Sequence, residues 1–250
     1  MQFDELQSVH NIDVWPIWQT FVDRFPTVTE MPPLFPVFEI FGQTNSLRLP
    51  PMDLGRLAAA PRYWFSSLDE TQIVQFQRDR FAHNWRKRDD SSPYPRYELI
   101  RAAFQREWRE LNELIQKRHG VLPTPNQCEI TYVNIIQASD PAADMLPQVL
   151  ECFREIRSDG LQRAERSAVK SQWVVEDAGR PVARLYAEAG STKDPAGTPI
   201  VQFTLTVRGP ASAPTEEAVL SFMDMGRKRI VTAFTELTTR TMHTLWGRTD

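Results

Sequence analysis

Two stretches of the chain predict the same order of secondary-structure elements. The first begins with a helix at residues 13–25, followed by three short strands and a long amphipathic helix at 95–119. After a single strand at residues 126–137 the order recurs, with a helix at 143–157, three strands and a long helix at 215–242. A repeated unit implies two similar layers related by pseudo-symmetry. A ligand or partner is therefore expected at the seam.

Apolar residues at helical spacing predict the three main helices. The stripes are Val14, Ile17, Trp18, Phe21 and Phe25, then Ile100, Phe104, Trp108, Leu111, Leu114 and Ile115, and finally Val219, Phe222, Met223, Ile230, Phe234 and Leu237. Thr215 is the expected N-cap of the last helix, whose first turn carries Glu216 and Glu217. Gly226 costs that helix about 1 kcal/mol relative to Ala, which indicates tight packing of the helix on a sheet.

Two antiparallel meanders are predicted between the helices. The first is read from PRYWFSS, TQIVQFQ and RFAHNWR, and the second from SQWVVED, RPVARLYAEAG and TPIVQFTLTVR. In the last of these strands Val201 and Phe203 alternate with Gln202 and Thr204, as in a sheet with one buried face. A Pro-rich stretch at residues 26–51 contains a further strand-like piece, PVFEIFG.

These patterns predict an α+β fold of two pseudo-repeated units, each of antiparallel strands packed by a long helix. The expected units are residues 1–122 and 123–250, and their plan is analogous to helix-grip and saddle folds. The second unit opens with a full strand, whereas the first has only MQF upstream of its helix. The first unit is thus expected to lack a strand, and its unpaired sheet edge would invite a partner strand.

Composition indicates a globular protein, with the cytoplasm as its expected location. Apolar residues make up 41% of the chain and charged residues 24%, and the net charge is −3. Such a small charge creates no global attraction to nucleic acid or acidic lipid. The chain has neither a secretory signal pattern nor an apolar run long enough to span a bilayer. Its two cysteines, Cys128 and Cys152, are expected to be reduced core residues.

Residues 78–90, RDRFAHNWRKRDD, form the most basic segment of the chain. One interpretation is nucleic-acid binding, in which the cations follow a phosphate backbone while an aromatic ring stacks on a base. The other, which we favour, is a strand with Phe81, His83 and Trp85 facing inward and a solvated charged turn at its end. The residues of the nucleic-acid hypothesis are Arg78, Arg80, Arg86, Lys87 and Arg88.

No catalytic, cofactor or metal site is predicted. The four histidines lie on separate expected elements without metal-ligand spacing, and no phosphate-binding glycine loop or nucleophile elbow is present. Glu129, Thr131 and Asn134 bring polar groups to the strand at 126–137. If buried, these groups must form hydrogen bonds, so they either line a polar pocket beneath the helices or bond to backbone at an exposed edge.

Several motifs together resemble a known protein family. They are NWRKR (84–88) with YPRYE (94–98), EITYVN (129–134) and the C-terminal MHTLWGR (242–248). The chain is similar nearly end to end to a sporadically distributed family of uncharacterised bacterial proteins of about 250 residues. Members of that family begin with an extra apolar strand that this chain lacks. Their patchy distribution implies an accessory role, such as defence or a toxin–antitoxin pair.

The leading functional hypothesis is a non-enzymatic binding protein that regulates a protein partner or senses a small ligand. Trp85, Arg86, Arg88, Tyr132 and Asn134 are the expected contacts. The alternatives are nucleic-acid binding through the basic strand and an enzyme, a nuclease or hydrolase, whose carboxylates converge only in the fold.

Overall fold

The computed structural model describes residues 1–42, 60–89, 91–137, 145–153, 160, 166–194 and 196–247. The chain divides into two compact units, each made of two separate segments. Unit 1 comprises Met1–Cys128 and Ala211–Phe222, and unit 2 comprises Glu129–Pro210 and Met223–Asp250.

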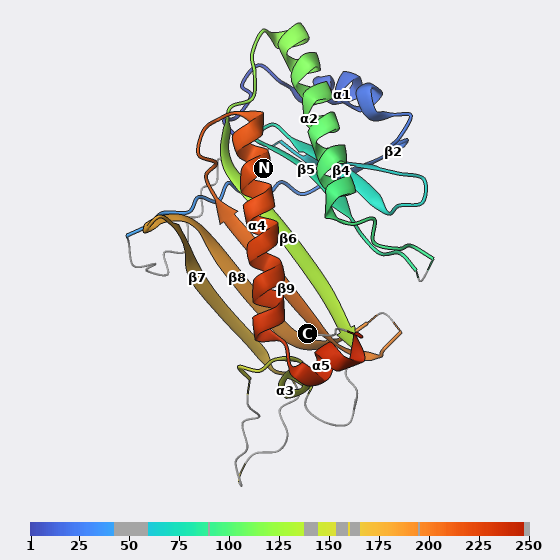
Figure 1. Cartoon of the computed structure of the whole chain (residues 1–250). Helices are drawn as coiled ribbons and strands as arrows, with labels where there is room; N and C mark the ends of the chain where they lie inside the picture. Colours follow the sequence, from blue (N-terminus) through green and yellow to red (C-terminus); the bar gives the residue numbers. More distant parts are fainter. Residues whose placement is uncertain are drawn as a thin grey trace. The chain divides into compact units, whose positions relative to one another are not determined.

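Figure 1 follows the elements along the chain. Unit 1 contains β1 (Gln2–Phe3), the 3-10 helix η1 (Asn11–Asp13), α1 (Val14–Phe21), β2 (Thr27–Met31), β3 (Arg62–Ser66), β4 (Gln72–Gln77), β5 (Arg80–Trp85) and α2 (Tyr97–His119). Unit 2 contains α3 (Met145–Val149), β7 (Ala168–Asp177), β8 (Arg180–Lys193), β9 (Pro199–Gly209) and α5 (Arg240–Leu245). Strand β6 (Pro125–Gln137) and helix α4 (Glu216–Leu237) begin in unit 1 and end in unit 2.

The fold is α+β, as the sequence predicts. In the described part of the chain, nine strands form an antiparallel sheet and five α-helices accompany them. Hydrogen-bonded neighbours follow the order β2-β3-β4-β5-β1-β6-β9-β8-β7. Both predicted meanders are present, β3-β4-β5 in unit 1 and β7-β8-β9 in unit 2. Across these described residues, no helix is long and apolar enough to cross a membrane.

Aromatic side chains form the core of unit 1. Phe65, Phe76 and Phe81 are almost fully buried and share one face of the meander, because Phe76 pairs with Phe81 and with Tyr63, two residues before Phe65. The centre of the Phe81 ring lies 5.9 Å from that of Phe104 and 5.7 Å from that of Trp108, both on α2. The predicted helical stripe therefore faces the strands.

An ion pair joins α2 to the first turn of α4 within unit 1. Arg109 donates from Nε and Nη2 to the Glu216 carboxylate at 2.6–3.0 Å, and Gln105 Nε2 donates to it at 2.7 Å. The hydrogen bonds from Arg109 hold the pKa of Glu216 below its usual value. Thr215 caps α4 as expected, since its Oγ1 accepts from Ala218 N at 3.2 Å.

The segment 32–41 of unit 1 is held by two buried glutamine side chains. Gln77 donates to Leu34 O and accepts from Leu34 N, each at 2.9 Å. Gln2 likewise donates to Val37 O at 3.1 Å and accepts from Val37 N at 3.0 Å. Each side-chain amide thus pairs with a main-chain amide as a neighbouring strand would. The predicted strand PVFEIFG instead lies outside the ladders, in a proline-rich segment that has fewer N–H donors to offer a ladder.

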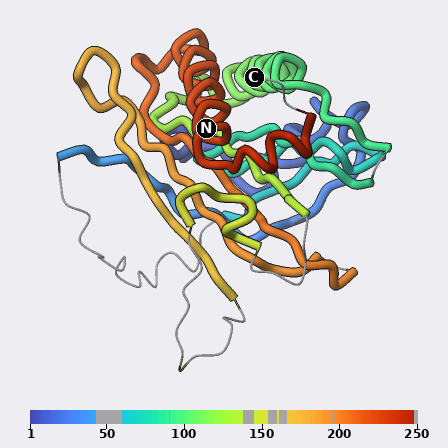
Figure 2. The backbone as a smooth tube through the Cα atoms, turned by 60° about the horizontal axis from the view of Figure 1, so that its bottom comes forward, coloured from blue at the N-terminus to red at the C-terminus, as the bar shows by residue number. Residues whose placement is uncertain are grey.

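Unit 2 is a sheet with one face packed by α4, as Figure 2 also shows. Val201, Phe203, Leu205 and Val207 of β9 are buried, while the residues between them are not. The hairpin predicted at Asp177-Ala178-Gly179 connects β7 and β8, with positive φ at Ala178 (48°) and Gly179 (73°). Two consecutive positive φ angles suit the tight turn of a two-residue hairpin.

Gly226 allows the closest approach of α4 to the strands of unit 2, as the sequence predicts. A Cβ atom added at this residue would lie 2.6 Å from Ile130 Cγ2 of β6 and 3.4 Å from Val207 Cγ1 of β9. Neither β-branched side chain can rotate freely away. Glycine is therefore required here by packing rather than by backbone conformation.

Three predicted helices end earlier than expected. The helix predicted at 13–25 stops as α1 at Phe21. Of the helix predicted at 143–157, only Met145–Val149 is helical among the described residues, because Val149 O and Glu151 N instead bond to the backbone of Thr239 and Leu237. The helix predicted to reach residue 242 breaks at Thr238, and Thr239 caps the separate helix α5.

The sequence reading missed two strands and misassigned one cysteine. Residues Gln2–Phe3 form β1 between β5 and β6, and Thr27–Met31 form β2 from within the Pro-rich stretch. Cys128 is buried as expected, but Cys152 is exposed because it follows the short helix α3 instead of lying within a longer one.

Gly226→Ala is expected to lower the free energy of unfolding by about 1–2 kcal/mol, because overpacking outweighs the gain in helix propensity. Urea unfolding measures this. Ser221→Ala, at an exposed position of the same helix, is the control and should be neutral or slightly stabilising. A Gly226→Ala protein as stable as wild type would contradict the packing.

The two thiols should differ in reactivity towards Ellman's reagent. Burial raises the pKa of Cys128 to about 11, so this thiol is protonated as well as inaccessible at neutral pH. One thiol per chain should react quickly in the native protein and the second only after unfolding. Cys152→Ser should abolish the fast reaction. Two fast thiols in the native wild type would contradict the burial of Cys128.

Candidate ligand-binding face

Unit 2 has a polar sheet face on the side opposite α4. We call it the polar face. Its members follow from the strand registers and from side-chain bonds between β6 and β9. They are Lys170 and Gln172 of β7, Tyr186 and Glu188 of β8, Gln202, Thr204, Thr206 and Arg208 of β9, and Glu129, Thr131, Val133 and Ile135 of β6.

Cross-strand polar contacts order one half of this face. Arg208 Nε donates to Glu129 Oε2 at 2.5 Å, and the Arg208 guanidinium also lies 5.5 Å from the centre of the Tyr186 ring. One pair further along, the Thr131 and Thr206 hydroxyls are 2.9 Å apart. The sequence left open whether Glu129 and Thr131 line a pocket or an edge. They pair across two strands instead.

The same pairing of β6 with β9 places two exposed aliphatic residues in the other half of this face. Glu129 lies opposite Arg208 and Thr131 opposite Thr206, so Val133 lies opposite Thr204 and Ile135 opposite Gln202. Val133 and Ile135 are each 56% exposed. Aliphatic and polar side chains therefore share one open surface.

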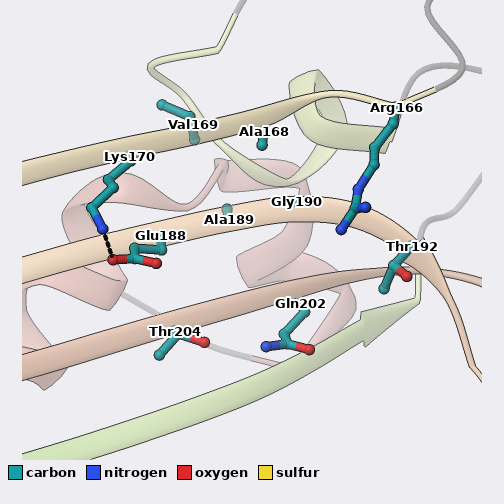
Figure 3. A pocket seen from close by; sticks show the side chains of 10 residues that line it. All are labelled: Arg166, Ala168, Val169, Lys170, Glu188, Ala189, Gly190, Thr192, Gln202 and Thr204. Atoms are coloured by element: carbon teal, nitrogen blue, oxygen red, sulfur yellow. Dashed lines mark ion pairs between the residues drawn. The ribbon is translucent and has the colours of Figure 1, made fainter. Parts of the chain in front are cut away.

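The other half of the polar face is hollowed into a shallow pocket of about 400 Å³ (Figure 3). Its floor lies at Ala168 and Gly190, a cross-strand pair of small residues on this face, and larger polar side chains surround them. The lining side chains come from β7, β8, β9 and Arg166, just ahead of β7. Small residues on neighbouring strands create the hollow because their side chains do not fill the face.

Every polar side chain of the pocket except Glu188 can donate a hydrogen bond. In Figure 3 the Arg166 side chain extends towards Thr192, and Gln202 and Thr204 lie on the next strand. Lys170 Nζ is 2.5 Å from Glu188 Oε1, which balances one of the two cationic side chains. The uncompensated positive charge among the lining residues is then that of Arg166. Such a set suits a ligand with an anionic group.

The described residues contain no cluster of three or more His, Cys, Asp or Glu side chains able to hold a metal ion. The pocket lining likewise has no cysteine, serine or histidine that could form a nucleophile–base pair. The groups that the lining offers are charged side chains, hydroxyls and an amide.

The predicted contact residues fall into separate groups. Trp85 packs its ring against Tyr94, with 5.2 Å between centroids. Arg86 and Arg88 meet at Glu70, whose carboxylate lies 3.2 and 2.9 Å from their Nη2 atoms. Asn134 Nδ2 donates to Phe203 O at 3.1 Å, so one predicted contact already bonds to backbone. Tyr132 lies two residues before it on β6, in unit 2.

The remaining cations of the predicted nucleic-acid strand are also engaged. Arg78 forms an ion pair with Glu5 at 3.0 Å. Arg80 donates to Gln2 at 2.6 Å and to Phe35 O at 3.1 Å, and so helps to hold the segment 32–41. Lys87 also has an interaction partner. Nucleic-acid binding here would have to compete with these contacts, and it stays a prediction.

A buried histidine–carboxylate pair lies between β5 and α2 in unit 1. His83 Nδ1 and Glu107 Oε2 are 2.6 Å apart, and their side chains are 1% and 0% exposed. Arg106 Nη2 approaches the other carboxylate oxygen at 3.3 Å. His83 Nε2 is buried without a hydrogen-bond partner among the described residues. Because both side chains are closed to solvent, the pair serves packing, as the inward orientation predicted for His83 suggests.

The pocket residues Arg166, Lys170, Gln202 and Thr204 were not predicted. The alternation of β9 indicates which side chains share a face, but no local pattern shows that Ala168 of β7 and Gly190 of β8 lie opposite each other. That coincidence depends on the register of the hairpins. A search for small residues at paired hairpin positions would have found it.

No family model, curated protein or solved structure matches this chain.

Glu107→Gln should lower the free energy of unfolding by about 1–3 kcal/mol, because the buried His83 ring loses its carboxylate partner. The double variant His83→Phe with Glu107→Leu should lose less, since neither polar group then remains. Urea unfolding of His83→Phe, Glu107→Leu and the double variant that combines them gives the coupling. Additive losses would contradict a direct interaction.

Proposed function

We propose that the protein is a non-enzymatic binding protein whose ligand contacts the polar face of unit 2. The observation that carries this proposal is the pocket in that face, where Arg166, Gln202 and Thr204 gather around small residues. The pocket joins a surface with exposed Val133 and Ile135. Charge, amide and aliphatic groups together are the usual composition of a recognition site.

The proposed ligand is a small metabolite with a carboxylate or phosphate group. Arg166 supplies a planar cation that such groups bind bidentately, and the Thr192 and Thr204 hydroxyls add neutral contacts. The ion pair between Lys170 and Glu188 leaves room for a competing anion, because Lys170 is two-thirds exposed. Surface ion pairs of this kind contribute little energy of their own, so a ligand can replace one.

The proposal extends to the two pseudo-repeated units and the helix-grip plan expected from the sequence. Each unit contains a meander of three antiparallel strands followed by a long helix, α2 after β5 and α4 after β9. In such an arrangement binding surfaces arise twice, and the copies are free to diverge. This supports a sensing or partner-regulating role in the bacterial cytoplasm. The family resemblance suggests defence or a toxin–antitoxin system as the setting.

The site is testable with citrate and inorganic phosphate as probes. Titration of ¹⁵N-labelled protein should shift backbone amide resonances in β8 and β9, near Gly190 and Gln202, with a dissociation constant in the range of about 0.1–10 mM. Arg166→Gln should weaken this binding about tenfold, by loss of a charge-assisted contact.

Arg180→Gln is the matched control, because Arg180 is an exposed residue at the start of β8, beside the turn that joins it to β7. It should leave both titrations unchanged. Absence of shifts with either probe would contradict the anionic ligand. Equal weakening by the two substitutions would show that the probes respond to overall charge and not to the pocket.

A further inference from the structure

In the described part of the chain no strand pairs with the outer edge of β7. β7 stands at the end of the strand order, with β8 as its neighbour in the described part of the chain. It is ten residues long, whereas β2 at the opposite end of the order has five. A long edge is the form of strand to which another strand adds most readily.

The residues of β7 that face outward follow from one hydrogen bond at its start. Ser191 N donates to Ser167 O, and the register of the hairpin pairs these two residues directly. In an antiparallel ladder the residues that bond to one neighbour alternate with those that bond to the other. Odd-numbered residues therefore use their main-chain groups on β8. Lys170, Gln172, Val174 and Glu176 direct theirs to the open edge.

The side chains of β7 complement themselves when two copies pair antiparallel. The main-chain groups at the open edge belong to even-numbered residues. Two copies can therefore form a ladder only when even-numbered residues of one lie opposite even-numbered residues of the other. Pairing about Trp173 puts Lys170 opposite Glu176 of the second copy, twice by symmetry. With Gln172 at the centre, Lys170 lies opposite Val174. With Val174 at the centre, Lys170 lies opposite the hairpin turn of the second copy. Charge complementarity thus selects one register.

The same register joins the two copies of Trp173. This side chain is 41% exposed and lies on the opposite side of β7 from Lys170. At the symmetry centre the Trp173 residues of the two chains would form a non-hydrogen-bonded pair, in which side chains approach most closely. Aromatic pairs at such positions are among the favourable cross-strand contacts. β2 offers no equivalent, because Glu30 is its single charged residue.

We propose that the chain forms a two-fold homodimer through antiparallel pairing of β7 with β7 of a second copy, centred on Trp173. Residues 169–177 of each chain form the ladder. Lys170 then lies in a charged row between Glu188 of its own β8 and Glu176 of the second copy, because its cross-strand partner within the chain is Glu188. In contrast, the cross-strand neighbour of Glu176 in β8 is Pro181, which carries no charge.

Sedimentation equilibrium of the full chain tests the dimer. Wild type should change from a mass near the 28.9 kDa of one chain to twice that value as its concentration rises to about 100 μM, since an interface of one strand pair is small and its Kd is expected to be roughly micromolar. A wild type that stays monomeric over this range overturns the proposal.

Three variants locate the interface. Lys170→Glu and Glu176→Lys each create two like-charge pairs and should weaken self-association at least about tenfold. An equimolar mixture of these two variants restores both opposite-charge pairs, so a heterodimer should form. Gln172→Pro removes an outward N–H and should abolish the dimer while leaving the β7–β8 hairpin intact, because proline is tolerated at a sheet edge. Gln172→Ala is the control and should dimerise normally.

Hydrogen exchange of the amides gives the register independently. The amides of Gln172, Val174 and Glu176 should become protected as wild-type concentration rises, while the amide of Trp173, which already bonds to β8, should change little. A dimer that survives Gln172→Pro, or a mixture of the charge variants that stays monomeric, would overturn the proposed pairing.

Discussion

The packing of α4 on β6 and β9 is the contact on which the architecture of unit 2 depends. Gly226 brings the helix against Ile130 and Val207, closer than any side chain would allow. This approach buries the odd-numbered residues of β9 and leaves the even-numbered ones on the other face. Because successive side chains alternate across a strand, the polar face is a direct consequence of the helix contact.

Unit 1 satisfies its polar groups in a different way. Gln2 and Gln77 use buried side-chain amides to bind the main chain of Leu34 and Val37. Such pairing satisfies main-chain groups that the proline-rich segment could not place in a regular ladder. On the opposite face of the same meander His83 and Glu107 compensate each other within the core. These contacts fix the positions of the elements that carry the four side chains.

Periodicity alone predicts most of the regular structure. Both meanders, the long helices and the requirement for Gly226 follow from local patterns. The early end of α3 and the break between α4 and α5 do not, because the backbone of Val149 and Glu151 pairs with residues about ninety positions away. The same reason applies to β1, whose two residues are strand only because β5 and β6 lie on either side of them.

The candidate site was less accessible to sequence reading than the fold. Basic and aromatic residues between Arg78 and Arg88 attract attention because they are adjacent in sequence, but Glu5, Gln2 and Glu70 engage their arginines. Along the chain, β7 and β8 lie between the pocket residues Arg166 and Gln202, and the two residues belong to no shared motif. Their proximity depends on register, which is fixed by the hairpin turn at Ala178 and Gly179.

The central claim is that binding occurs on the polar face of unit 2. Hydroxyl-radical footprinting of the protein inside its native cells, compared with the purified protein, tests this most directly. Oxidation of Tyr186, Val133 and Ile135 should be reduced in cells, while the exposed Ile12 and Leu68 of unit 1 should be oxidised equally in both samples. Equal oxidation of the polar face in both samples would contradict the claim.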